Sequence, residues 1–121
     1  MIGSLNLNQK ELKDILKEYY EKIYGDVEIN FLAIDWEAKT KYGIRLTRNQ
    51  RIGKEKLVKI NEELEEEDIK EFLNNVFQDI GYNIENISFQ TITNKQDFGE
   101  YTYLESLNIE FGKKTVKLKR L

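Results

Sequence analysis

The stretches LNQKELKDIL (residues 7–16) and LEEEDIKEFL (residues 64–73) read as two versions of one helix start, 57 residues apart. In the first, Asn8 is followed three residues later by Glu11, which is the pattern of a capping box. A helix is therefore predicted to begin at Gln9. The second stretch repeats the arrangement, with a glutamate near the cap position.

Apolar residues at helical spacing follow each start. They recur every three or four residues until Gly25 in the first segment and until Gly81 in the second. Glycine commonly ends a helix because it adopts the left-handed conformation at little cost. The predicted buried stripes are Leu12, Ile15, Leu16, Tyr19 and Ile23 in the first helix, and Ile69, Phe72, Leu73, Val76 and Ile80 in the second.

A predicted strand follows each helix, DVEINFLAIDW (residues 26–36) and NIENISFQTIT (residues 83–93). Alternating apolar residues and a Gly-Lys pair come next in both halves, at Gly53 and at Gly112. Such a pattern predicts a hairpin in each half. In the second half the returning strand would be TVKLKRL, after residue 114.

The repeated order of helix, strand and hairpin predicts an internal duplication of an αβββ unit. We expect one domain over residues 1–121, with repeats at approximately 7–62 and 64–120. The predicted fold is α+β, a mainly antiparallel six-stranded sheet with two helices on one face, or two abutting sheets. The exposed sheet face would then be the largest available surface.

One alternative to the first strand is a calcium loop. Asp26, Glu28, Asn30 and Glu37 have the spacing of EF-hand positions 1, 3, 5 and 12. However, Phe31 stands where the sharp turn of that loop needs glycine. The strand is therefore the better interpretation.

The composition restricts the kinds of catalytic and metal-binding site that the chain can form. The chain has 121 residues, a net charge of -3, 34% charged residues, and neither histidine nor cysteine. Histidine is the usual general base near neutral pH, and both residue types are the preferred ligands of transition metals. We therefore expect no enzyme activity of the common hydrolase kinds, no metal site and no cofactor, although a carboxylate pair for glycoside chemistry stays open.

The longest apolar run, residues 31–34, is far shorter than the roughly 20 residues of a membrane span. The absence of cysteine fits a reducing compartment. We expect a cytoplasmic protein that does not bind membranes.

The segments ELKDILKEYYEKIYGDVEINF (residues 11–31) and EEDIKEFLNNVFQDIGYNIENISF (residues 66–89) resemble parts of small uncharacterised proteins of phages and mobile elements from AT-rich bacteria. In size and composition the chain is also loosely similar to inhibitors of bacterial defence systems, such as anti-CRISPR proteins. The resemblance implies action on a host protein and identifies no catalytic residue.

Charge is distributed in blocks. Residues 39–61 carry eight basic side chains and one acid, whereas residues 62–79 carry eight acids and one base. A basic β-ribbon over residues 41–59 is a candidate for nucleic-acid binding. The acidic helix that follows is expected to neutralise part of it, which favours a solvated face. The candidate nucleic-acid-binding residues are Lys41, Arg45, Arg51, Lys54, Lys56 and Lys59.

Aromatic residues mark a second candidate surface. The segment NKQDFGEYTY (residues 94–103) is predicted as a long loop that carries Phe98, Tyr101 and Tyr103 as partner-binding residues. The alternative is that both tyrosines begin the next strand and pack inward with Leu107. The leading functional hypothesis is a non-enzymatic protein-binding module, the alternative is a nucleic-acid binder, and a homodimer is possible for either.

Overall fold

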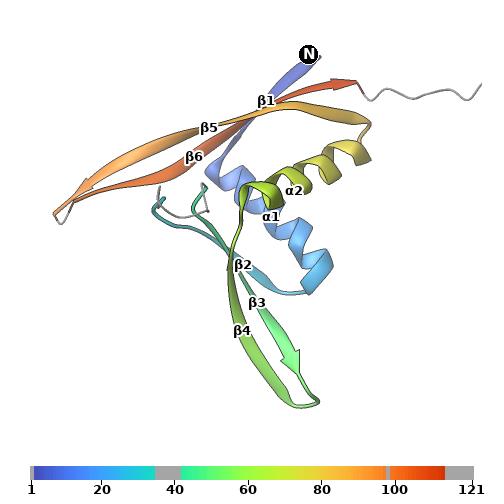
Figure 1. The fold of residues 1–121 in the computed structure, drawn as a ribbon, viewed down its shortest axis with the longest axis vertical. Helices are drawn as coiled ribbons and strands as arrows, with labels where there is room; N and C mark the ends of the chain where they lie inside the picture. The colour runs from blue at the N-terminus through green and yellow to red at the C-terminus, as the bar shows by residue number, and fades with distance from the viewer. Residues whose placement is uncertain (1, 35–41, 98, 114–121) are drawn as a thin grey trace, which may run out of the picture.

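The computed structural model describes residues 2–34, 42–97 and 99–113 (Figure 1). It shows an α+β fold in which two helices lie between two small antiparallel sheets. In chain order the elements are β1 (Gly3–Asn8), α1 (Gln9–Tyr24), β2 (Val27–Phe31), β3 (Ile44–Ile52), β4 (Lys56–Glu63), α2 (Glu66–Asp79), β5 (Tyr82–Gln96) and β6 (Gly99–Lys113).

The start of α1 confirms the predicted capping box. The Glu11 backbone N–H donates to Asn8 Oδ1 at 2.9 Å, and the Asn8 N–H donates to Glu11 Oε1 at 3.2 Å. Gly25 caps the other end with a φ of 81°. These local interactions explain why the helix begins at Gln9 as expected.

The start and end of α2 are also close to the prediction. The Glu65 N–H donates to the Asp68 carboxylate at 2.9 Å, and Gly81, with a φ of 87°, follows the last turn. The buried stripes are confirmed except at their ends, where Ile23 and Ile80 are 55% and 62% exposed. Both residues lie at the C-terminal ends of their helices and line hollows beside the helix pair.

The strands form two three-stranded sheets, in the orders β1-β6-β5 and β2-β3-β4, so the single six-stranded sheet is wrong. The prediction missed β1, although Leu5 and Leu7 alternate with asparagines as in a strand. Because β1 pairs antiparallel with β6, the third strand of its sheet comes from the opposite end of the chain.

The two predicted Gly-Lys turns have different outcomes. Gly53 lies in the turn between β3 and β4 with a φ of 69°, as predicted. Gly112, by contrast, lies inside β6, and the chain passes from β5 to β6 between Gln96 and Gly99 instead. The predicted returning strand at residues 114–120 lies outside the described residues.

The element order strand–helix–strand–strand occurs twice, as β1–α1–β2–β3 and β4–α2–β5–β6. Each sheet contains two strands from one half and one from the other. β1 of the first half joins β5 and β6, and β4 of the second half joins β2 and β3. The predicted αβββ order is present in the first half, as α1–β2–β3–β4, whereas the described residues of the second half give α2–β5–β6. Duplication itself stays a prediction.

One apolar core joins the helices to the inner faces of both sheets. Phe72 of α2 is fully buried, and its ring meets that of Tyr19 on α1 edge-on at 5.1 Å. Leu46 from β3 and Leu107 from β6 belong to the same cluster. The core leaves the outer face of each sheet, and the distal ends of two long hairpins, for contacts with other molecules (Figure 1).

Candidate interaction surfaces

The outer face of the sheet β1-β6-β5 is polar and almost free of charge. The strand register places Leu7, Leu107 and Phe89 side by side on the inner face, so the residues between them point outward. Glu85 and Glu110 are charged residues of this outward set; Glu85 lies at a bulge between Ile84 and Asn86, and its carboxylate lies on the outward side of Gly112. We define the outer face as Ser4, Asn6, Asn8, Glu85, Asn86, Ser88, Gln90, Ile92, Asn94, Tyr101, Tyr103, Ser106, Asn108 and Glu110.

Hydrogen bonds between side chains connect the three strands across this face. Asn6 Nδ2 donates to Asn108 Oδ1 and, at 3.3 Å, to Ser106 Oγ. Ser106 Oγ in turn donates to Gln90 Oε1 at 3.1 Å. Since the bonds hold the amides in fixed orientations, the outer face is a preorganised array of donors and acceptors.

Sequence reasoning predicted an exposed sheet face but none of its amide and hydroxyl residues. The signal was present in the alternation of Leu5 and Leu7 with Ser4, Asn6 and Asn8. This alternation identifies the outward-facing residues of β1 alone. The assembly of three such rows depends on pairing between residues about 100 positions apart.

The structure places Tyr101 and Tyr103 in β6, so the predicted long loop is wrong and the alternative, in which both tyrosines begin the next strand, is confirmed for their place in the strand. A register shift leaves Glu105 without a partner on β5, so that Ser106 lies opposite Gln90 and Leu104 opposite Thr91. This bulge inverts the alternation of inward-facing and outward-facing residues in β6, so that Tyr101 and Tyr103 face the opposite side from Leu107. Both tyrosines therefore lie on the outer face, away from Leu107, while the third predicted aromatic, Phe98, lies outside the described residues.

The basic ribbon is the hairpin of β3 and β4, which extends away from the core (Figure 1). The register places Arg45, Thr47, Asn49 and Arg51 on one face of β3, opposite to that of the buried Ile44 and Leu46, with Lys59 of β4 opposite Asn49. Lys41 lies outside the described residues.

Two arginines near the base of this hairpin are paired with glutamates of β4. Arg45 lies 3.7 Å from Glu63, and Arg48 lies 2.8 Å from Glu62. The Arg48 guanidinium also stacks 4.4 Å from the centre of the Tyr24 ring. These two cations are thus occupied by neighbours within the fold.

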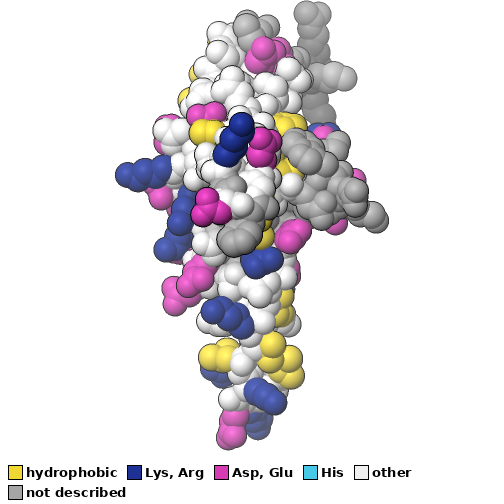
Figure 2. Space-filling view, turned by 90° about the vertical axis from the view of Figure 1, so that its left-hand side faces the viewer, with side chains coloured by type: hydrophobic (Ala, Val, Ile, Leu, Met, Phe, Trp, Pro, Cys, Tyr) yellow, Lys and Arg dark blue, Asp and Glu magenta, His cyan; other side chains and the backbone are white. Residues whose placement is uncertain are grey.

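Cations farther along the hairpin have no ion pair within the part of the chain that the structure describes. They lie beside the exposed apolar residues Ile52 and Leu57, which are 57% and 63% exposed. Figure 2 shows these basic and apolar side chains together at the lower end of the molecule. The unpaired cations are Arg51, Lys54, Lys56 and Lys59.

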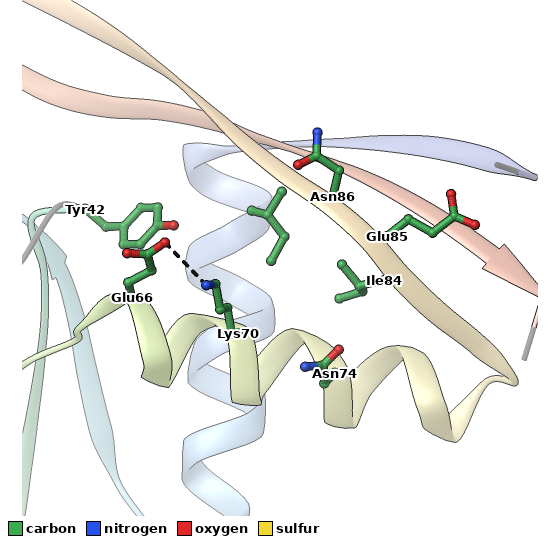
Figure 3. A pocket seen from close by; sticks show the side chains of 8 residues that line it. Tyr42, Glu66, Lys70, Asn74, Ile84, Glu85 and Asn86 are labelled. Atoms are coloured by element: carbon green, nitrogen blue, oxygen red, sulfur yellow. Dashed lines mark ion pairs between the residues drawn. The ribbon is translucent and has the colours of Figure 1, made fainter.

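A polar hollow of about 390 Å³ lies between α2 and β5 (Figure 3). Glu66 and Lys70 of α2 form an ion pair at 3.5 Å on its wall. Burial, followed by the nearby Glu66 carboxylate, raises the pKa of Tyr42, so its hydroxyl remains protonated near neutral pH. The hollow therefore offers a hydrogen-bond donor and a neutralised pair, and no nucleophile activated by a base.

An apolar hollow of about 220 Å³ lies between β1, the two helices and the end of β6. Leu5, Phe72 and Phe111 are among its lining residues. Few polar groups face it, so little would fix the orientation of a small ligand.

Among residues 2–34, 42–97 and 99–113, no group of three or more acidic side chains is arranged to hold a metal ion. No helix in those ranges is long and apolar enough to cross a membrane. Comparison of the chain with protein-family models, curated proteins and solved structures finds no match.

Proposed function

We propose that the protein is a non-enzymatic module that binds another protein through the outer face of the sheet β1-β6-β5. The observation that carries this proposal is the composition of the face. In a chain with 34% charged residues, the face carries few charged side chains, Glu85 and Glu110 among them, and presents Tyr101 and Tyr103 beside rows of serine, asparagine and glutamine.

This composition is typical of surfaces that recognise proteins. Binding loops of antibodies combine tyrosine with serine and asparagine, because tyrosine supplies contact area at low entropic cost and the small polar residues supply adaptable hydrogen bonds. Charged residues are depleted at the centres of protein interfaces, where each buried charge needs a partner. A face that presents amides and tyrosines is suited to a neutral polar surface on the partner.

The resemblance to proteins of phages and mobile elements makes a host defence protein the first partner to test. Affinity capture from lysate of a bacterial host, with and without nuclease treatment, separates protein partners from nucleic acid. A protein retained after nuclease treatment supports the proposal. Capture that depends entirely on nucleic acid contradicts it.

Changing Tyr101 and Tyr103 together to serine should weaken binding of the captured partner by about 30-fold or more, since aromatic anchors of interfaces commonly contribute about 2 kcal/mol. Titration calorimetry with the purified partner measures the change. The control is Ile52→Ser with Leu57→Ser, which removes exposed apolar side chains from the other hairpin. Equal loss in both variants would place the binding surface elsewhere.

The second candidate function is nucleic-acid binding by the hairpin of β3 and β4. One observation favours it. At the distal end of the hairpin, near Ile52 and Leu57, a cluster of cations forms no ion pair with any described residue. A two-stranded basic ribbon can follow phosphates or enter a groove. The acidic pI of about 5.2 argues against a general nucleic-acid binder.

The two functions differ in their response to salt. If the hairpin binds nucleic acid, affinity for labelled random duplex falls steeply with salt, and changing Arg51, Lys56 and Lys59 together to alanine flattens the slope. We expect no salt-sensitive binding at physiological ionic strength in a fluorescence anisotropy titration. Tight, salt-sensitive binding that the triple variant abolishes would reverse the order of the two proposals.

A further inference from the structure

The strand β5 is an edge strand of unusual length and composition. It has 15 residues and pairs on one side with β6, as the outermost strand of its sheet. Its segment NISFQTITN, residues 86–94, contains no charged residue and no proline. Isoleucine, threonine and phenylalanine favour extended structure, so this segment is well suited to pairing with a further strand.

The other edge strands are protected against such pairing. Edges in natural proteins are commonly kept short or carry charges. β1 and β2 are short, with 6 and 5 residues, and β4 carries Lys56, Lys59 and two glutamates. Of the edge strands in the part of the chain that the structure describes, only β5 is both long and free of charge along its centre.

Within the described residues, the distal half of the sheet also has no third strand. β1 pairs with residues 106–111 of β6, whereas residues 91–96 of β5 pair with residues 99–104 of β6 as a two-stranded ribbon. The ribbon extends away from the helices (Figure 1). The Thr102 carbonyl on the β6 side accepts a hydrogen bond from the Ile34 N–H at 2.7 Å. A two-stranded ribbon is marginally stable alone, so a strand added along β5 would stabilise it.

We propose that the β5 edge pairs antiparallel with β5 of a second copy of this chain, about a two-fold axis at Gln90. The segment 86–94 is its own complement in this arrangement. Asn86 lies opposite Asn94 of the second copy, Gln90 opposite Gln90, and the uncharged stretch has Glu85 at one end and Lys95 at the other. Antiparallel pairing about Gln90 therefore brings no like charges together along this stretch.

The remaining pairs are also favourable. On the inner face Phe89 lies opposite Thr91 and Ile87 opposite Thr93, and pairs of apolar or aromatic residues with β-branched ones stabilise sheets. Lys95 already lies 3.8 Å from Glu100 in its own chain, so the pairing depends on residues 86–94 and not on the end charges. A two-fold arrangement uses the same edge on both copies and closes the assembly at a dimer.

The dimer contains one continuous six-stranded sheet, three strands from each copy. Its outer face is twice as large and offers two sets of Tyr101 and Tyr103 to a partner. The inference rests on the edge of β5 and stands apart from the proposed function. A monomeric protein would still present the outer face, and a dimer would form without any partner.

The test uses the full chain and charge placed at the axis. Gln90 is exposed, and either charged variant puts like charges opposite each other in a homodimer. In sedimentation equilibrium we expect the wild-type chain at 28.8 kDa, twice its 14.4 kDa, and Gln90→Lys and Gln90→Glu each at 14.4 kDa. An equimolar mixture of the two variants should return to 28.8 kDa, which also shows that both variants fold.

The matched control is Ser4→Lys, which adds a lysine to the same outer face on the opposite edge strand β1 and should remain dimeric. A monomeric wild-type chain overturns the inference. So does a Gln90 variant that remains dimeric, a mixture that fails to associate, or dissociation of the Ser4→Lys control.

Discussion

Replacing Phe72 with alanine should lower the free energy of unfolding by about 3–5 kcal/mol, the usual cost of removing a buried phenylalanine. Phe72 is fully buried in α2 and meets the ring of Tyr19 on α1 at 5.1 Å. Its removal leaves a cavity where the helices meet, and rigid neighbours close such a cavity only in part. Urea denaturation followed by circular dichroism measures the loss.

Ile80→Ala is the control for this prediction. Ile80 directly follows α2, is also a large apolar residue, and is 62% exposed. Its truncation should change the free energy of unfolding by about 0.5 kcal/mol or less, as for most surface substitutions. Similar losses in both variants would contradict the position of Phe72 at the centre of the core.

Gly43→Ala should be the second most destabilising change, at about 3 kcal/mol. Gly43 has a φ of 62°, a left-handed conformation that costs alanine about 1–2 kcal/mol. A Cβ at this position would overlap the backbone carbonyl oxygen of Leu32. The backbone N–H of Leu32 in turn donates to the carbonyl oxygen of Gly43 at 2.7 Å. The added methyl group must therefore push the two backbone segments apart, at the point where the chain enters β3.

Gly53→Ala separates the two contributions. Gly53 has a φ of 69°, and an added Cβ would meet nothing within 4 Å. This variant should lose only the backbone cost of about 1–2 kcal/mol. The difference between the variants in thermal and urea unfolding then measures the close approach to Leu32. Equal losses would mean that the approach is relieved without cost.

The elements that the sequence determined by itself depend on neighbours along the chain. The box of Asn8 and Glu11, the stops at Gly25 and Gly81, and the turn at Gly53 need only residues a few positions away. Their free energies come from local hydrogen bonds and backbone preferences. Composition is likewise independent of the fold: the chain has neither histidine nor cysteine, two side chains on which catalysis and transition-metal binding commonly depend.

Tertiary structure alone decided which strands meet and which way their residues point. β1 joins β6 across about 100 residues, and this pairing places Asn6 beside Asn108. A single bulge at Glu105 turns Tyr101 and Tyr103 to the outer face, against the alternation read from Leu107. Backbone hydrogen bonds between strands are the same for every sequence, so the choice of partner is made by the side chains that must be buried together. That collective packing, and not any one segment, assembled the polar outer face and left the β5 edge without a further strand among the described residues.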